Sequence, residues 1–466
     1  MALIFFNDLT RTNEEFVPLC KDVVTIYSCG PTVYNFPHIG NYRAFLFNDV
    51  LRRYLKFRGY KVKHVMNLTD VDDKTIRDSQ KEGISLREFT NRYADAFFSD
   101  LKKLNAETVE FYPRATDYIP EMVDVVSRLI AKGHTYEGED GIYFRISSFP
   151  SYGKLAGIKV DDLKEGARVK QDEYDKEHAA DFVLWKKYQP DDGAVFWETK
   201  LGKGRPGWHI ECSAMSTKLL GDTIDIHTGG VDLIFPHHEN EIAQSECATG
   251  KQFVRCWMHN EFILVNGKKM SKSLGNFYTL RDLIDKDMDV SAIRYVLIST
   301  HYRMPLNFTF EGVDAARQSI LRLRELAGKL ADVKDECEPN PDVTELINKT
   351  RSGFIESMDD DLNISGALAA VFEFVKSANT MVAENSLSKS DADKCYDLLM
   401  QFDAVIGVIG DVSSEKIPIE VTDLAEERLS ARKKKDWAES DRLRTKITDL
   451  GYTIDDNKEG YRLKRL

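Results

Sequence analysis

The chain lacks the long apolar runs that membrane proteins need. None of its 466 residues belongs to an apolar stretch approaching the about 20 residues of a membrane span. The N-terminal MALIFFNDLTRTNEEF is too short in its apolar part and too acidic for a signal peptide. We therefore expect a cytoplasmic protein that makes no contact with a membrane.

Cysteines are few, and none of them are closely spaced. The seven are an odd number spread over a long chain, which is not typical of a disulfide framework. No pair has the CxxC spacing that is common in structural zinc sites. We therefore expect the protein to be in a reducing compartment, where thiols are available as ligands or reactive groups.

Positive charge is scarce over most of the chain. A net charge of −12 excludes a protein that coats nucleic acid indiscriminately. Residues 421–466 are the exception, with 12 Lys or Arg against 10 Asp or Glu. This favours one localised contact with a polyanion, although a solvated helix would have the same charge pattern. Arg432, Lys433 and Trp437 there combine charge with an aromatic face on which an unpaired base can stack.

The first 67 residues contain a strand–helix–strand unit. Residues 23–29 are rich in β-branched side chains and predict a buried strand, residues 42–58 have helical periodicity, and residues 62–67 predict a second strand. Polar motifs stand at the ends of both strands, and ligands of doubly wound sheets bind at that edge. Strands resume at 223–228 and 261–265, so an insertion divides one nucleotide-binding fold into two halves.

Beyond residue 276 the pattern becomes helical, as in a bundle. Residues 411–418 predict a linker, and a charged helix over 421–450 followed by a small hairpin ends the chain. The sequence thus predicts an α/β fold, with a Rossmann-type doubly wound parallel sheet split by an insertion, then an α-helical bundle and a small C-terminal helix-plus-hairpin module. The expected boundaries are 1–111 and 206–265 for the two halves of the sheet domain, 112–205 for the insertion, 266–310 for the loop segment that follows, 311–410 for the bundle and 419–466 for the last module.

Four scattered residues predict a metal site. Cys29, Cys212, His237 and Glu241 offer two thiolates, an imidazole and a carboxylate, which are all good zinc ligands. His237 and Glu241 are four residues apart behind Pro236, which suits a helix start, so they share one helix face. Ligands scattered at strand ends are more typical of an active-site metal than of a structural one. We expect one zinc ion per chain.

Other assignments stay open at this stage. Taken alone, each cysteine or histidine is more often a buried structural residue than a ligand. His209, His227, His238 and Glu239 could each replace one of the four. The helical spacing favours His237 over His238, because the i+4 partner of His238 is an isoleucine that cannot ligate.

Two further motifs suit a nucleotide. HIGN begins at His38 and opens a helix, where an imidazole can donate to phosphate oxygens, Gly40 lets a nucleotide approach the backbone, and the helix N-terminus favours an anion. KMSKS spans residues 269–273 in a glycine-flanked loop after a strand. Its lysines, Lys269 and Lys272, can stabilise charge that develops on pyrophosphate.

Together these residues resemble the class I aminoacyl-tRNA synthetases, and specifically the cysteinyl-tRNA synthetases. The similarity covers essentially the whole chain through YSCGPTVYNFPHIGN, NLTDVDDK, PGWHIECSAM, HTGGVDLIFPHHENE and KMSKSLGN. It implies a connective domain at the insertion, a stem-contact segment after KMSKS and a C-terminal anticodon-binding module. It also implies a monomer that uses L-cysteine, ATP with Mg²⁺ and tRNA(Cys), with the zinc binding the substrate thiolate and taking no part in the chemical step.

The resemblance also assigns individual residues. Cys29, Cys212, His237 and Glu241 match the zinc ligands of the family, Lys272 its ATP-binding lysine, and Thr69, Trp208 and Asp232 positions that line the cysteine pocket. One position departs from the usual pattern: HIGH is replaced by HIGN, and Asn41 can donate a hydrogen bond but cannot become cationic. A charged contact at that position is therefore in doubt.

Two alternative functions remain. One is the related ligase that joins cysteine to an amino-sugar in mycothiol synthesis, a shorter chain without an anticodon module, so residues 421–466 count against it. The other is an inactive paralogue that binds tRNA or senses cysteine. Asn41 favours this second alternative, and the intact KMSKS counts against it.

Overall fold

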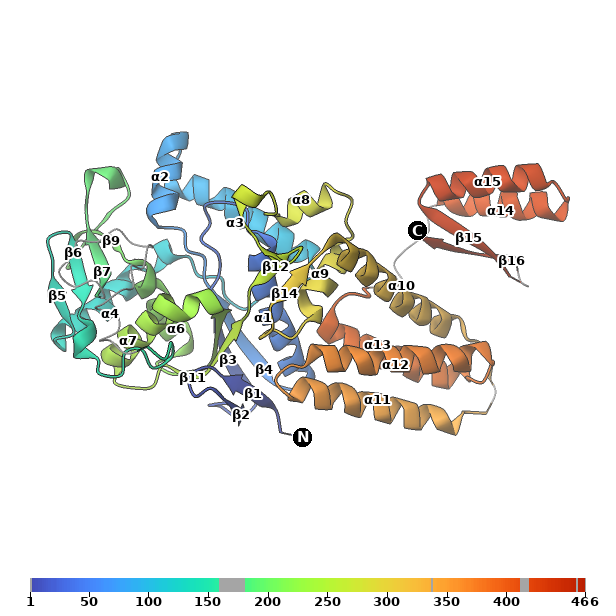
Figure 1. Cartoon of the computed structure of the whole chain (residues 1–466), viewed down its shortest axis with the longest axis horizontal. Helices are drawn as coiled ribbons and strands as arrows, with labels where there is room; N and C mark the ends of the chain where they lie inside the picture. Colours follow the sequence, from blue (N-terminus) through green and yellow to red (C-terminus); the bar gives the residue numbers. More distant parts are fainter. Residues whose placement is uncertain (1, 159–180, 337, 411–418, 458–459, 466) are drawn as a thin grey trace. The chain divides into compact units, whose positions relative to one another are not determined.

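The computed structural model describes residues 2–158, 181–336, 338–410, 419–457 and 460–465 (Figure 1). They fall into two compact units, Met1–Ile409 and Gly410–Leu466. The expected linker, residues 411–418, lies outside the described residues. Across the described part of the chain, no helix is both long and apolar enough to cross a membrane.

Four parallel strands form the central sheet of the first unit. Their order is β11-β10-β3-β4, with bounds β3 (Val23–Ser28), β4 (Lys61–Met66), β10 (Ile224–Gly230) and β11 (Val254–Asn260). β10 is buried along almost its whole length, because helices pack against the sheet, and this accounts for the apolar composition of the strands. Helix α1 (Ile39–Phe57) connects β3 to β4.

An antiparallel sheet is inserted between β4 and β10. Its order is β5-β6-β7-β9-β8, with bounds β5 (Thr135–Glu137), β6 (Gly141–Phe144), β7 (Phe182–Lys187), β8 (Trp197–Thr199) and β9 (Gly202–Pro206). Helix α4 (Ile119–Ala131) precedes it, and α6 (Trp208–Leu220) and α7 (Glu239–Thr249) follow.

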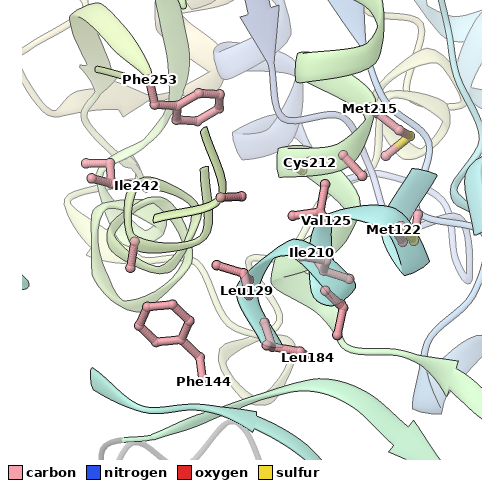
Figure 2. Packing of buried hydrophobic residues seen from close by; sticks show 14 of the residues in the cluster. Met122, Val125, Leu129, Phe144, Leu184, Ile210, Cys212, Met215, Ile242 and Phe253 are labelled. Atoms are coloured by element: carbon pink, nitrogen blue, oxygen red, sulfur yellow. The ribbon is translucent and has the colours of Figure 1, made fainter. Parts of the chain in front are cut away.

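The inserted sheet and these three helices share one hydrophobic core (Figure 2). Leu129 of α4, Phe144 of β6, Leu184 of β7, Ile210 of α6 and Ile242 of α7 are all buried in it. The insertion therefore fixes the position of α6 and α7, the two helices that carry Cys212 and Glu241.

The remaining elements flank the central sheet or follow it. β1 (Ile4–Asn7) pairs with β2 (Thr12–Glu15), and α2 (Asp73–Glu82) and α3 (Leu86–Lys103) follow β4. A small sheet of order β13-β12-β14 comes next, with β12 (Ile263–Val265), β13 (Lys268–Lys269) and β14 (Leu306–Phe308). The helices of this part are α8 (Leu280–Ile284), α9 (Val290–Ser299), α10 (Phe310–Asp332), α11 (Pro341–Asp359), α12 (Ile364–Ala383) and α13 (Lys389–Ile406), of which the last four form the bundle.

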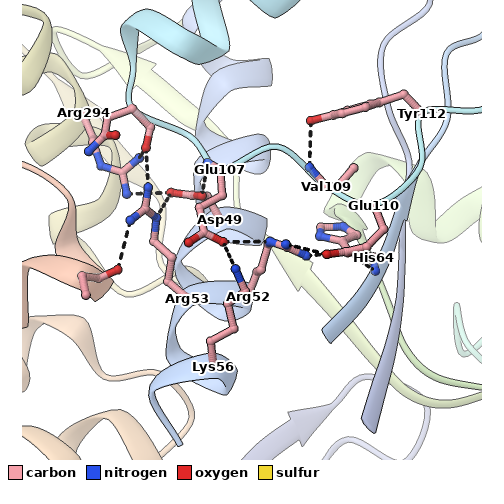
Figure 3. Close-up of polar contacts among 12 residues, drawn as sticks. Asp49, Arg52, Arg53, Lys56, His64, Glu107, Val109, Glu110, Tyr112 and Arg294 are labelled. Atoms are coloured by element: carbon pink, nitrogen blue, oxygen red, sulfur yellow. Dashed lines mark hydrogen bonds and ion pairs between the residues drawn. The ribbon is translucent and has the colours of Figure 1, made fainter. Parts of the chain in front are cut away.

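An ion-pair network centred on the buried Asp49 and Arg294 joins α1 to the bundle (Figure 3). We call it the α1 network; its charged members are Asp49, Arg52, Arg53, Lys56, Glu107, Glu110 and Arg294. Asp49 accepts hydrogen bonds from Arg53 at 2.8 Å, from Arg294 at 2.7 Å and from the backbone N–H of Glu107 at 2.7 Å. Arg294 also donates to the carbonyls of Leu104 and Ile406, at the end of α13. The network thus holds the bundle against the helix that begins at HIGN.

The second unit contains α14 (Ile419–Lys433), α15 (Trp437–Asp449) and a hairpin of β15 (Tyr452–Asn457) and β16 (Gly460–Arg465). The expectation of a single helix over residues 421–450 is wrong. The first helix ends before Lys435, which has a φ of +62°, and the Asp436 side chain caps a new helix. The hairpin is as expected, and the predicted fold class is confirmed by the split parallel sheet with its following helices.

Candidate metal centre and nucleotide site

The four predicted metal ligands lie together at the carboxyl edge of the central sheet. Cys29 directly follows β3, and Cys212 lies in the second turn of α6. His237 lies in the short helical turn Ile234–His238 that leads into α7, and Glu241 lies in the first turn of α7. One donor atom of each lies within 4.8 Å of those of the others. His237 Nε2 is 3.0 Å from Glu241 Oε1, as the four-residue spacing predicts. We call these four residues the ligand cluster.

A second group of donors overlaps with the ligand cluster. Cys29 and Glu241 also lie within 4.8 Å of donor atoms of His227 and His238. His238 has no i+4 partner that can ligate, yet its Nε2 lies 3.2 Å from Cys29 Sγ, a contact that helical spacing does not predict. Because both groups share Cys29 and Glu241, they describe one site and not two.

The other histidines are placed to orient the ligands. His209 Nδ1 lies 2.8 Å from His237 Nδ1, and His227 Nε2 lies 3.1 Å from Glu241 Oε2. His238 Nδ1 lies 2.7 Å from His259 Nε2, whose other nitrogen is 2.7 Å from Asp8. Such outer contacts fix ring orientation and ligand basicity in metal sites. These contacts do not separate the two donor groups, because they hold His238 as well as His237 and Glu241.

Glu239, the fourth alternative, has a different role. Its carboxylate accepts three backbone N–H groups, from Gly153, Leu155 and Ala156, at 2.8–3.0 Å. These bonds attach the inserted domain to the start of α7. Because both carboxylate oxygens of Glu239 accept them, this side chain is not a member of the ligand cluster.

Proton affinities in the ligand cluster are strongly shifted. Burial raises the pKa of Cys29 well above its usual value. Burial acts on Cys212 in the same direction, but a hydrogen bond from Cys29 and the nearby His237 lower the pKa of Cys212 to about 6. Burial opposes charge on His237 and Glu241 too, yet their mutual attraction raises the pKa of His237 to about 10, and His227 and His237 together lower that of Glu241 to about 2. A dication bound here would displace the protons of Cys29 and His237.

HIGN forms the first turn of α1. His38 is the N-cap; its Nδ1 accepts from the Asn41 N–H at 3.2 Å, and Asn41 Oδ1 accepts from the His38 N–H at 3.1 Å. An imidazole that accepts at Nδ1 carries its proton at Nε2. Asn41 therefore completes a capping box, a role that the sequence analysis missed. A Cβ at Gly40 would lie 3.0 Å from the His38 ring and 3.1 Å from Ile263, so glycine also makes room for that ring.

KMSKS is held close to HIGN by backbone contacts. The Ile39 N–H donates to the Tyr278 carbonyl at 2.9 Å, and His38 pairs with Thr279 in an isolated β-bridge. Asn276 closes the loop through bonds to the Ser271 N–H and the Lys269 carbonyl. Lys269 ends β13 and is exposed, whereas the side chain of Lys272 lies outside the described part of the structure.

The three predicted pocket residues differ in their burial and in their contacts. Trp208 stacks on His237 with ring centroids 4.3 Å apart, and Asp232 is exposed on the turn after β10. Thr69 is buried and donates to Glu211 at 2.8 Å. Glu211 was missed by the sequence analysis, although a carboxylate next to Cys212 was the available signal. Burial, together with the neighbouring Cys212, raises the pKa of Glu211 well above its usual value.

The predicted tRNA-contact residues lie at the junction of α14 and α15. Trp437 is 58% exposed and Lys433 is exposed. The Arg432 guanidinium lies 5.7 Å from the Trp437 ring centroid and pairs with Asp456 at 2.7 Å. The charge of Arg432 is thus partly neutralised within the unit, while Lys433 and Trp437 face solvent.

Three family models match successive parts of the chain. Residues 15–318 match "tRNA synthetases class I (C) catalytic domain", residues 353–410 match "DALR domain" and residues 414–461 match "Cysteinyl-tRNA ligase anticodon binding domain".

Two relatives that match the chain over its full length are cysteine–tRNA ligases. The chain is 48% identical to a cysteine–tRNA ligase of Protochlamydia amoebophila (100% of this chain and 98% of the relative) and 47% identical to one of Brachyspira hyodysenteriae (99% of each). Among solved structures it is similar to a methionyl-tRNA synthetase of Mycobacterium tuberculosis in complex with methionyl-adenylate. That likeness has a TM-score of 0.60 and 16% identity over 83% of this chain and 90% of the other, so it concerns the fold alone.

Proposed function

This chain belongs to the cysteine–tRNA ligase family of class I aminoacyl-tRNA synthetases, and we propose that it selects cysteine by its thiol, activates it as cysteinyl-adenylate and transfers it to tRNA(Cys). The observation that carries this proposal is the approach of two thiols, an imidazole and a carboxylate to within 4.8 Å of one another, in a chain that also brings HIGN and the segment after KMSKS into contact.

The ligand cluster fits a zinc ion. Its donor set of two sulfurs, one nitrogen and one oxygen suits zinc better than the all-oxygen preferences of Mg²⁺ or Ca²⁺. Cys29, Cys212, His237 and Glu241 would hold the ion, and His209 and His227 would orient two of them. When bound, zinc supplies an electrophilic centre with affinity for the substrate thiolate.

The activation step needs no nucleophile from the protein. The cysteine carboxylate attacks the α-phosphorus of ATP, the bond from that phosphorus to the bridging oxygen breaks, and pyrophosphate leaves with the electron pair. His38 stabilises the developing phosphate charge through its Nε2 proton, with Asn41 holding the ring at its other nitrogen. Lys269 and Lys272 act on the pyrophosphate from the loop. The terminal ribose hydroxyl of the tRNA then attacks the activated carbonyl, and AMP leaves.

The second unit supplies the tRNA specificity in this proposal. Trp437 offers an exposed ring on which an unpaired base can stack, and Lys433 offers a cation for phosphate. Removal of residues 419–466 should spare the activation of cysteine and reduce the charging of tRNA. The mycothiol ligase has no counterpart of this unit, so a dependence of the reaction on it also separates the two functions.

Cysteine-dependent exchange of pyrophosphate into ATP tests the proposal. We expect exchange with cysteine and about 10⁴-fold less exchange with serine. The serine hydroxyl is a poor zinc ligand, so serine would leave the metal position unfilled. This loss is comparable to that of a substrate analogue that lacks a group to which the site forms a hydrogen bond. An apolar pocket alone would separate the two by only about 10–200-fold. If exchange still distinguishes cysteine from serine after the metal is removed, the ion has a structural role. If the protein exchanges no pyrophosphate with cysteine, it is the inactive paralogue.

A further inference from the structure

Three side chains from distant parts of the chain meet beside the segment that follows KMSKS. The Arg281 guanidinium of α8 lies over the Phe36 ring, 4.5 Å from the ring centroid, and its Nε lies 3.5 Å from Asp100 Oδ2 of α3 (Figure 1). Phe36 comes two residues before His38, and Arg281 comes two residues after Thr279, which pairs with His38. We call Phe36, Asp100 and Arg281 the α8 triad. It adds a side-chain contact to the backbone contacts between the two nucleotide motifs.

Asp100 is the buried member of the triad. Its side chain is 1% exposed, and its Oδ2 accepts a hydrogen bond from the Tyr42 hydroxyl of α1 at 3.0 Å. Two cations lie close to its carboxylate: Arg281 at 3.5 Å and Lys103 at 3.9 Å. Lys103 belongs to α3 itself, so the pair with Arg281 is the one that draws α8 toward α3. Solvent screens a pair with a buried carboxylate less than a surface pair, and this attraction therefore favours one position of α8.

Phe36 gives the guanidinium its second contact. Tyr93 of α3 supports the Phe36 ring edge-to-face, with ring centroids 5.4 Å apart and an angle of 72° between the ring planes. A guanidinium over an aromatic face is attracted by the ring electrons and can stack on the ring. The Arg281 Nε forms no hydrogen bond with the residues that the structure describes. The position of this guanidinium therefore depends on the ring as well as on the carboxylate.

The triad lies at the end of the segment that follows KMSKS. Asn276 closes the KMSKS loop, and the ring of the next residue, Phe277, lies 5.2 Å from that of His38. The backbone contacts with HIGN follow at residues 278 and 279. Contacts at neighbouring residues permit the segment to rotate about them, and the side-chain contact at Arg281 opposes this rotation. The triad is thus placed to fix how the KMSKS loop is oriented toward His38.

We propose that Arg281 is a positioning residue for the activation step: held by Phe36 and Asp100, it orients the KMSKS loop so that the loop lysines act on the same pyrophosphate as His38. In this role Arg281 acts through the loop and not on the substrate. Charge on the pyrophosphate grows as its bond to the α-phosphorus breaks. Misplaced lysines therefore slow that step and leave the binding of cysteine unchanged. This inference rests on the proposed function.

Cysteine-dependent pyrophosphate exchange by the full-length, zinc-loaded protein tests the role of Arg281. Arg281→Met should lower kcat about 10²-fold, the loss expected when a catalytic group is misplaced by about 1 Å, with the KM for cysteine nearly unchanged. In a Lys272→Ala background the same substitution should cost about 10-fold or less, because both changes remove the action of the same lysine. A residue that only stabilises the fold would lower kcat by the same factor in both backgrounds.

Substitutions of the Phe36 ring give a second test. Phe36→Leu removes the aromatic face and should lower kcat in the same way, whereas Phe36→Tyr keeps that face and should exchange pyrophosphate at the normal rate. Arg317→Met, at an exposed arginine of α10, is the matched control and should change nothing. Zinc content and calorimetric binding of cysteine should equal those of the wild type in all of these variants.

Three results would overturn the inference. A normal kcat in Arg281→Met or in Phe36→Leu would remove the triad from the reaction. Equal factors in the two backgrounds would mean that Arg281 does not act through the KMSKS loop. Loss of zinc or of cysteine binding would make the triad a support of the fold. Failure of the proposed function gives a different result, because the wild type itself would then exchange no pyrophosphate.

Discussion

The ligand cluster and the centre of the α1 network are both buried and polar, but cations compensate the burial of Asp49 in the network, whereas no cation among the described residues compensates the burial of Cys29 in the cluster. In the α1 network, Arg294 and Arg53 outweigh burial and lower the pKa of Asp49, and the Arg294 guanidinium donates from all three of its nitrogens. In the ligand cluster, burial raises the pKa of Cys29, and Glu211 beside it has an oxygen without a partner. Buried polar groups that satisfy one another hold a fold together, and those that do not are suited to a ligand.

The largest expected effect comes from removing one thiol from the ligand cluster. Cys212→Ser should lose the metal and with it the activation of cysteine, by more than the about 10- to 100-fold that follows loss of an outer contact. Metal analysis and pyrophosphate exchange on the purified variant measure it. Cys247→Ser is the matched control, since Cys247 is a buried cysteine of α7 outside the cluster. Full metal content in Cys212→Ser would remove this residue from the site.

Breaking the α1 network should instead cost stability. Arg294→Met leaves the buried Asp49 with Arg53 as its remaining cation, and loss of one partner from a buried pair costs about 3–5 kcal/mol. Denaturant unfolding measures the loss, and the metal content of the folded protein should stay normal. Arg92→Met, at an exposed pair with Glu82, should change nothing measurable. An unfolding free energy equal to that of the wild type would mean that the network does not support the fold.

Removing the charge of Lys272, which belongs to neither the ligand cluster nor the α1 network, should affect only the rate of pyrophosphate exchange. Lys272→Ala should slow pyrophosphate exchange by about 10²–10³-fold while cysteine binding and stability stay normal, because its partner charge develops in the transition state. Lys286→Ala is a suitable control, as an exposed lysine of the same segment. A variant that exchanges pyrophosphate at the normal rate would contradict the assignment.

The smallest effect is a pH dependence at the edge of the α1 network. Burial, with Arg52 nearby, lowers the pKa of His64 from its usual 6.5 to about 3. Between these values the unfolded chain binds a proton that the folded protein does not, so the free energy of unfolding should fall as pH decreases from 6.5, by at most about 1.4 kcal/mol per pH unit. Unfolding at pH 6.5 and pH 5 should show a smaller difference in His64→Gln than in the wild type. Equal differences in both would mean that His64 does not contribute.

Much of the molecule could be read from its sequence because the relevant signals are local. Helical spacing placed His237 and Glu241 on one face, strand composition located β3 and β4, and turn residues placed HIGN and KMSKS at strand ends. The single helix expected over residues 421–450 failed for an equally local reason: Lys435 adopts a left-handed conformation, which composition does not reveal.

Long-range contacts could not be read in this way. The sequence by itself determined which residue types were available for a metal, a nucleotide and a tRNA, and in which order along the chain they occur. Only the tertiary structure decided that His238 lies beside Cys29, that Arg294 closes the α1 network and that Thr69 contacts Glu211. The last of these bonds joins residues 142 positions apart, and no periodicity or propensity extends over such a distance. The contacts of His238 and Glu211 form because the inserted sheet packs against α6 and α7. This packing brings distant polar groups into a space from which water is excluded, where each must find a partner or remain available for a ligand.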